Sequence, residues 1–207
     1  MKELLETWTP KTKVGQLVKS GRITSIEELI LNHYRITEPE IVDLLLPSIE
    51  QEVIDIQMVQ RQTDAGERSS YRAIVAVGNR DGFVGLGAGK STHVVMAIEK
   101  ATLRAKMNLS HVIRGCGSWE CACGEPHSLL TRVRGKFGSV EIEVLPGPRG
   151  LGLVAGDIAK TILRLAGVED CWTRTFGETR TPLSMAGATY VALKNTLSFV
   201  LPATWKA

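Results

Sequence analysis

The middle of the chain combines a strand pattern with a helix pattern. Residues 71–78 form an apolar, β-rich run, the turn-forming tetrapeptide 79–82 tolerates positive φ, and residues 83–87 form a second apolar arm. The segment after Ser91 has apolar positions at helical spacing, namely Val94, Ile98, Ala101 and Ala105. We therefore predict a β-hairpin followed by a helix with one apolar face.

One face of the second arm carries almost no side chains. Phe83, Gly85 and Gly87 share this face by strand alternation, so another backbone can approach it closely. We expect that backbone to be a phosphodiester chain. A further strand at 53–61, joined by a loop at 63–68, completes a predicted three-stranded sheet covered by the helix.

The N-terminal segment, residues 1–47, predicts short helices. Two residue pairs have the capping-box spacing, Ser25 with Glu28 and Thr37 with Glu40. The apolar residues of these helices are Leu29, Ile30, Ile41, Leu44 and Leu45. They are covered either by the chain's own domain or by a partner protein, and the sequence leaves both alternatives open.

The C-terminal part predicts a second domain. A hairpin is expected from the runs 132–136 and 140–144, whose basic and acidic residues can pair across the strands. The elements expected after it are a helix at 154–166, a strand at 171–176 and a helix at 182–197. The order ββαβα predicts a small α+β sandwich with both helices on one face of the sheet.

The 207 residues are enough for two small domains, each with an ordinary core. The parts expected are a helical N-terminal extension (1–48), a first α+β domain (49–114), a Cys/Gly-rich link (115–130) and a C-terminal domain (131–207). The amino terminus has no apolar run typical of a signal peptide, and no segment is long enough to span a bilayer. We expect a cytoplasmic protein without a membrane partner.

The basic charge is concentrated in the middle third of the chain. Residues 60–114 contain nine basic and four acidic residues, whereas residues 1–59 contain six basic and ten acidic ones. A solvated helix face is the ordinary explanation of such a run, but the basic residues of the adjoining strands and loops favour binding to RNA phosphates. The candidate RNA-binding residues are Arg61, Arg68, Arg72, Lys90, Lys100, Arg104 and Arg149.

A nucleotide-binding loop is the alternative for the glycine-rich run before Ser91. The P-loop pattern fails here, because Val84 occupies the position of its first glycine. The sequence also lacks GxSxG and HExxH patterns. We therefore name no catalytic residue, although a glycine-rich turn that enters a helix can still offer backbone N–H groups to an RNA phosphate.

Three of the four cysteines are clustered. Cys116, Cys121, Cys123 and His127 have the spacing C-x4-C-x-C-x3-H. Three thiolates and an imidazole can close a tetrahedral zinc shell with no open position for catalysis. The spacing departs from the common CxxC pattern, so reduced cysteines without a metal remain the alternative to a structural zinc ion. Cys171 stands apart and is expected to pack in the second domain.

Residues 75–87 (VAVGNRDGFVGLG), residues 146–156 (PGPRGLGLVAG) and residues 165–170 (LAGVED) resemble the S-five family of small-subunit ribosomal proteins. The resemblance extends from about residue 52 to residue 197 in the family's order. The helical front and residues 114–119 resemble the archaeal and eukaryotic branch of the family.

The resemblance implies a double-stranded-RNA-binding-like domain followed by the family's second domain. It further implies binding to small-subunit rRNA, contacts with ribosomal proteins S four and S eight near the point where mRNA enters the subunit, and support of translational accuracy. By position, residues 64–69 match the family's loop towards the junction of head and body; this loop is less basic here than in bacteria.

The chain is thus expected to be a structural, non-enzymatic component of the small ribosomal subunit, with no required cofactor. Two alternatives come from other classes: an RNA-processing or nucleotide-dependent enzyme built on the second domain, and a free translation regulator that binds mRNA. Co-sedimentation with small subunits distinguishes the ribosomal component from both.

Overall fold

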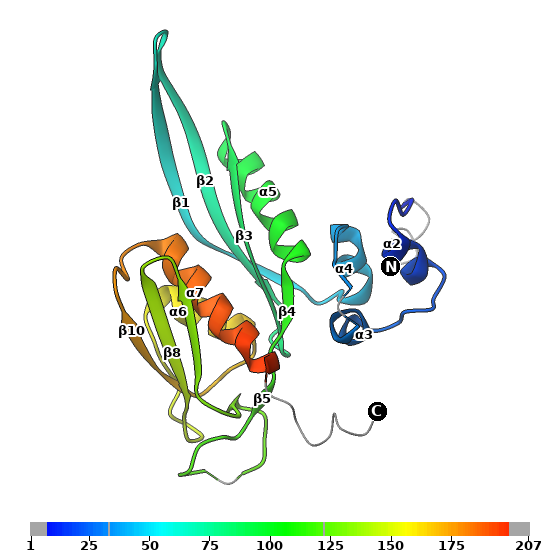
Figure 1. Cartoon of the computed structure of the whole chain (residues 1–207), viewed down its shortest axis with the longest axis vertical. Helices are drawn as coiled ribbons and strands as arrows, with labels where there is room; N and C mark the ends of the chain where they lie inside the picture. Colours follow the sequence, from blue (N-terminus) through cyan, green and yellow to red (C-terminus); the bar gives the residue numbers. More distant parts are fainter. Residues whose placement is uncertain (1–7, 33, 122, 199–207) are drawn as a thin grey trace. The chain divides into compact units, whose positions relative to one another are not determined.

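The structure is a computed structural model that describes residues 8–32, 34–121 and 123–198. These residues divide into two compact units. The first contains the described residues up to 79 together with 85–110, and the second contains 80–84 and the described residues from 111 onwards. Both units mix helices with antiparallel sheet, so the α+β class predicted from the sequence is confirmed (Figure 1). Among the described residues, no helix has the length and apolar character needed to cross a membrane.

The first unit is built on a sheet of four strands in the order β1-β2-β3-β4. Its strands are β1 (Glu50–Thr63), β2 (Gly66–Gly78), β3 (Phe83–Ser91) and β4 (Leu109–His111). The prediction of three strands was wrong because β4 is too short to show a periodic pattern. The turn between β2 and β3 contains two residues with positive φ, Arg80 at 55° and Gly82 at 90°, as the sequence predicts.

Strand β1 and strand β2 are longer than the sequence predicts. They pair in antiparallel register as far as Thr63 opposite Gly66, so the connection is a tight turn and the expected loop at 63–68 is wrong. Gly66 has φ of 108°, a value that favours glycine and permits this turn. Polar residues fill both strands at this end, and they hide the strand pattern because neither face is buried.

Helix α5 (Val94–Met107) lies against the glycine face of β3. A Cβ atom built on Gly85, Gly87 or Gly89 would come within 2.3 Å, 2.2 Å and 2.3 Å of the carbonyl oxygens of Ala105, Ala101 and Ala97 respectively. The close approach predicted for this face is real, but the partner is the helix backbone and not a phosphodiester chain. The run 87–90 also belongs to β3 itself, so no glycine loop enters the helix.

The core under α5 consists of small and β-branched side chains. Ala97, Ala101 and Ala105 are fully buried against Val75 and Val77 of β2. The apolar face of the helix was expected to consist of residues 94, 98, 101 and 105. In the structure Ala97 belongs to this face as well, while Val94 and Ile98 are only half-buried. Alanine on the helix and glycine on the strand allow the two backbones to approach each other more closely than larger side chains would.

The N-terminal helices are α2 (Lys13–Lys19), α3 (Ile26–Leu31) and α4 (Pro39–Leu45). The Ser25 side chain accepts a hydrogen bond from the Glu28 N–H at 3.3 Å, which confirms that half of the predicted capping box. The predicted Thr37 cap is wrong, because α4 begins at Pro39 with Glu38 in the capping position. Leu29 and Ile41 are fully buried, which favours packing within the chain's own domain.

The second unit contains a sheet in the order β7-β8-β10-β9. Its elements are β7 (Val133–Phe137), β8 (Val140–Pro146), β9 (Leu153–Val154), α6 (Asp157–Leu165), β10 (Cys171–Phe176), α7 (Pro182–Lys194) and the 3-10 turn η1 (Asn195–Ser198). Helix α6 starts three residues after the expected position, because residues 153–154 pair with β10 in a short parallel ladder instead. Helices α6 and α7 pack beside each other, and α7 covers β7 and β8.

The predicted pairing of basic and acidic residues in the C-terminal hairpin is confirmed. Arg134 lies opposite Glu143, and Lys136 lies opposite Glu141. The Nη2 atom of Arg132 lies 2.6 Å from Oε1 of Glu143, and Arg134 forms an ion pair with Glu141. These glutamates therefore have structural partners.

Candidate nucleic-acid interface and metal centre

The clearest candidate for an anion-binding site is a pair of arginines on the long hairpin of the first unit. Arg61 of β1 and Arg68 of β2 lie directly opposite each other in the antiparallel register, and both side chains are exposed. No ion pair is found for either residue among the described parts of the chain. Because like charges placed opposite each other destabilise a hairpin, the arrangement favours an external anion between or beside them.

Two more of the predicted residues lie on the same face of the sheet as this pair. Arg72 is on β2 four residues after Arg68, and strand alternation places both on one face. Tyr71 and Ala73 pack in the core on the side of the sheet that α5 covers. Because side chains alternate along a strand, the arginines face away from the helix. Lys90 also faces away from α5, because its neighbour Gly89 packs against that helix. We call Arg61, Arg68, Arg72 and Lys90 the sheet-face cluster.

The helix residues form a separate group. Lys100 and Arg104 are exposed and lie one helical turn apart on α5, which covers the opposite face of the sheet. Arg104 also donates a hydrogen bond from Nη1 to the carbonyl oxygen of Ala88 at 2.7 Å, which fixes its side chain next to β3. Lys106, the basic residue near this face, instead forms an ion pair with Asp43 of α4 at 2.6 Å. The basic residues of the first unit, which the sequence led us to expect on one surface, thus form two groups on opposite faces of the sheet.

Arg149 belongs to the second unit and already has a protein partner. Its Nη1 atom lies 2.8 Å from Oε2 of Glu125, and 64% of its side chain is exposed. The exposed fraction leaves room for a phosphate contact, but the carboxylate reduces the net positive charge there.

Sequence reasoning missed a basic recess in the second unit. Lys160 and Arg164, which lie one turn apart on α6, line this concavity together with Arg80. Its remaining lining residues are Leu153, Gly167, Val168 and Glu169. The i, i+4 spacing of the two helix residues was the available signal, but nothing in the sequence joins Arg80 to them.

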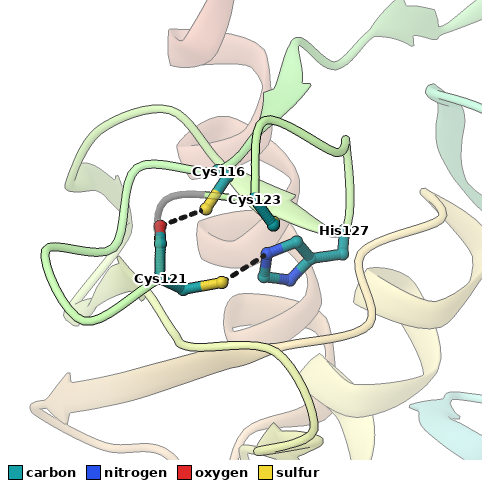
Figure 2. Close-up of side chains that lie close together, drawn as sticks. All are labelled: Cys116, Cys121, Cys123 and His127. Atoms are coloured by element: carbon teal, nitrogen blue, oxygen red, sulfur yellow. Dashed lines mark hydrogen bonds between the residues drawn. The ribbon is translucent and has the colours of Figure 1, made fainter.

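The Cys/His cluster is assembled by a short ladder in the link. Strands β5 (Arg114–Gly115) and β6 (Ser128–Leu129) pair so that Gly115 lies opposite Ser128. This pairing brings Cys116 and His127 next to each other at the base of the loop between the strands. The sulfur and ring nitrogen atoms of Cys116, Cys121, Cys123 and His127 all lie within 4.8 Å of one another (Figure 2).

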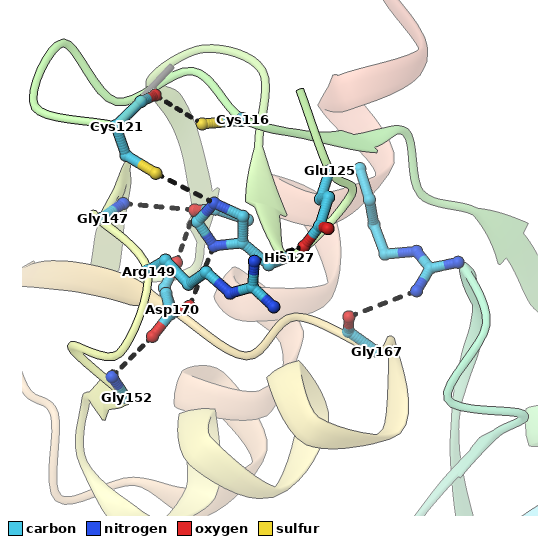
Figure 3. Close-up of polar contacts among 11 residues, drawn as sticks. Cys116, Cys121, Glu125, His127, Gly147, Arg149, Gly152, Gly167 and Asp170 are labelled. Atoms are coloured by element: carbon cyan, nitrogen blue, oxygen red, sulfur yellow. Dashed lines mark hydrogen bonds and ion pairs between the residues drawn. The ribbon is translucent and has the colours of Figure 1, made fainter. Parts of the chain in front are cut away.

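The histidine of this cluster is buried and held from behind. Nδ1 of His127 lies 2.9 Å from Oδ2 of Asp170, and Nε2 faces the Cys121 sulfur at 3.9 Å (Figure 3). The other carboxylate oxygen of Asp170 accepts a hydrogen bond from the Gly152 N–H at 2.7 Å. The side chains of His127 and Asp170 are each only 5% exposed. Asp170 thus connects the cluster to the glycine-rich turn at 146–152, and sequence reasoning gave it no role in the site.

The environment of the cysteines affects their protonation. A hydrogen bond from His127 lowers the pKa of Cys116 to about 6. The backbone N–H of Arg149 lowers the pKa of Cys121. Cys171 differs, because burial and the nearby Asp170 charge raise its pKa to about 12. Cys171 is fully buried, as expected for a packed, unreactive thiol.

Family models match most of the chain. The model described as "Ribosomal protein S5, N-terminal domain" matches residues 49–113. The model described as "Ribosomal protein S5, C-terminal domain" matches residues 135–206. Between the two matched ranges lies the segment that carries the Cys/His cluster.

Several archaeal proteins are similar along nearly the whole chain, and each bears the name "Small ribosomal subunit protein uS5". The protein of Pyrobaculum aerophilum is 58% identical over 94% of this chain and 89% of its own length. That of Aeropyrum pernix is 58% identical over 97% of this chain and 92% of its own length. That of Staphylothermus marinus is 53% identical over 99% of this chain and 95% of its own length.

Proposed function

The chain belongs to the ribosomal protein S5 family, and we propose that it binds small-subunit rRNA through the sheet-face cluster and the basic side of α5. As a member of this family it is a structural component of the cytoplasmic ribosome and not an enzyme, so the enzyme alternative is wrong.

The observation that carries the RNA-binding proposal is the opposed pair Arg61 and Arg68. An RNA phosphate, with its negative charge and several acceptor oxygens, accepts hydrogen bonds from both guanidinium groups and offsets much of the repulsion between them. Arg72 and Lys90 extend the same face along the sheet. Contacts of this kind recognise the shape and backbone of RNA more than its base sequence.

We further propose a double-stranded-RNA-binding-like fold for residues 49–114 and the family's second-domain fold for residues 131–207. The antiparallel strands covered by α5 support the first assignment. The hairpin and the two helices of the second unit support the other. The helical extension (1–48) and the link (115–130) complete the proposed division of the chain.

The resemblance also suggests specific neighbours in the subunit. We propose contacts with ribosomal proteins S four and S eight near the point where mRNA enters, and a contribution to translational accuracy. The tip of the β1–β2 hairpin, with Asp64 and Ala65 in the turn, is the proposed part that reaches towards the junction of head and body. Arg149 is a proposed RNA contact of the second unit. A phosphate would either replace Glu125 as its partner or bind while that ion pair is kept.

Replacing Lys100 and Arg104 together with alanine is expected to weaken binding to a transcript of the cognate small-subunit rRNA. With two phosphate contacts fewer, binding releases fewer counterions. The negative slope of log affinity against log salt should therefore become flatter, by about 2. Filter binding or fluorescence anisotropy at several salt concentrations measures this slope with the full chain.

The matched control removes two lysines from the acidic part of the chain. Lys11 and Lys13 are both exposed on the N-terminal extension, and the Lys11→Ala/Lys13→Ala double variant loses the same formal charge. We expect its salt slope to remain close to that of the unchanged chain. Equal slopes for the two double variants would remove α5 from the RNA interface, while an Arg61→Ala/Arg68→Ala variant tests the sheet-face cluster separately.

Sedimentation of native cell extract through sucrose gradients tests ribosome membership itself. We expect the protein to move with small subunits until high salt removes it, because many phosphate contacts are salt-sensitive. A peak in the light fractions at low salt would favour the free mRNA-binding regulator instead.

A further inference from the structure

The link between the two family domains contains a set of side chains whose chemistry the RNA-binding function does not use. Cys116, Cys121 and Cys123 converge with His127 on one point, and the loop that carries them is closed by the β5–β6 ladder. Three soft sulfur donors and an imidazole are a donor set for zinc, whereas magnesium and calcium prefer oxygen.

The spacing of the donor atoms fits one metal ion. With Zn–S bonds of about 2.3 Å, two sulfur ligands of a tetrahedral ion lie about 3.8 Å apart. The donor atoms here lie within 4.8 Å of one another, so small side-chain movements bring all four to bonding distance. An iron–sulfur cluster inserts several atoms between its ligands and needs a wider cage.

His127 has the hydrogen-bond partner that is typical of metal-binding histidines, namely a carboxylate at the ring nitrogen that does not face the metal site. Its Nδ1 atom is hydrogen-bonded to the Asp170 carboxylate, which leaves Nε2 free to face the sulfur atoms. A carboxylate in this position fixes the ring orientation and the tautomer with the proton on Nδ1. The backbone reinforces the position, because the carbonyl oxygen of His127 accepts hydrogen bonds from the N–H groups of Glu169 and Asp170 at 2.9 Å and 3.2 Å.

We propose that Cys116, Cys121, Cys123 and Nε2 of His127 bind one structural zinc ion, positioned by Asp170. Binding replaces the three thiol protons, which pass to solvent, and leaves no open coordination position. The ion fastens the loop between β5 and β6 to the turn at 146–152, through His127, Asp170 and Gly152.

The first test is the metal content of the full chain, purified without a metal-affinity tag and measured by elemental analysis. We expect about one zinc ion per chain. Cys116→Ser and His127→Gln should each lose most of the zinc, whereas Cys171→Ala is the matched control and should keep it, because Cys171 lies outside the cluster. Less than about a tenth of an equivalent in the unchanged chain would overturn the proposal.

Cobalt substitution gives a readout of the ligand set that does not depend on stability. Protein stripped with a chelator and titrated with Co2+ should show the visible absorption of tetrahedral, thiolate-bound cobalt, saturating at one equivalent. Asp170→Asn should shift the titration to about 10- to 100-fold weaker binding while the absorption band keeps its position. Absence of thiolate absorption would show that the cysteines do not bind a metal, and an unchanged band in Cys116→Ser would show that Cys116 is not a ligand. Either result would overturn the proposal.

Discussion

Gly87→Ala is expected to destabilise the first unit strongly, although it adds a single methyl group. The new Cβ would lie 2.2 Å from the carbonyl oxygen of Ala101 and 2.4 Å from the backbone nitrogen of Ala105, so helix α5 must move away from β3. Overpacking at a contact between backbones cannot be relieved by a rotamer change, and we expect a loss of about 3 kcal/mol. Urea unfolding followed by circular dichroism measures the change.

The matched control for this substitution is Gly156→Ala. Gly156 has negative φ and no heavy atom within 4 Å of a built Cβ, so the added methyl group meets only solvent. The expected loss in the free energy of unfolding is at most about 1 kcal/mol, because Gly156 is the N-cap of α6 and alanine is less favourable there than glycine. If Gly87→Ala and Gly156→Ala had equal effects, the close packing of α5 on the glycine face would be wrong.

Asp170→Ala is expected to have the largest effect in the second unit. The carboxylate is buried and accepts hydrogen bonds from His127 and from the backbone of Gly152. Its removal leaves the buried His127 donor and the half-buried N–H of Gly152 without this partner. Breaking a buried polar pair on one side costs about 3 kcal/mol or more. Unfolding should be compared in the presence of a chelator, so that a bound metal contributes to neither protein.

Asp157→Ala serves as the control for this prediction. Asp157 is exposed in the first turn of α6, where a carboxylate interacts favourably with the helix dipole. Its removal should cost no more than about 1 kcal/mol. A loss of similar size for the two aspartates would show that the network around Asp170 contributes little to folding.

The periodic and local signals of the chain determined most of the elements. The hairpin at residues 71–87, the helix after it and the C-terminal hairpin were all predictable, because side-chain alternation and helical spacing report which face is buried. Ser25 was recognised as a helix cap for a similar reason, since a cap depends on residues three positions apart. The short strands β4 and β9 were missed because they are too short to show alternation, and the polar end of the long hairpin was missed because neither of its faces is buried.

Other features were decided only by the tertiary structure. The sequence shows that Gly85 and Gly87 leave one strand face bare, but not that α5 folds back onto that face and occupies it. Strand register, which depends on pairing along the whole hairpin, sets Arg61 opposite Arg68. The packing of α5 on one face of the sheet separates Lys100 and Arg104 from the sheet-face cluster, although all these residues lie in one basic stretch of the sequence.

The candidate metal centre shows most clearly which features the sequence determined and which only the tertiary structure decided. The sequence by itself determined the proposed ligands, because Cys116, Cys121, Cys123 and His127 lie within one short segment and are typical zinc-binding residue types. It did not determine Asp170, which is 43 residues away from its partner His127. Contacts at such separations are fixed by the packing of the second unit, and a single sequence carries no local pattern that reveals them.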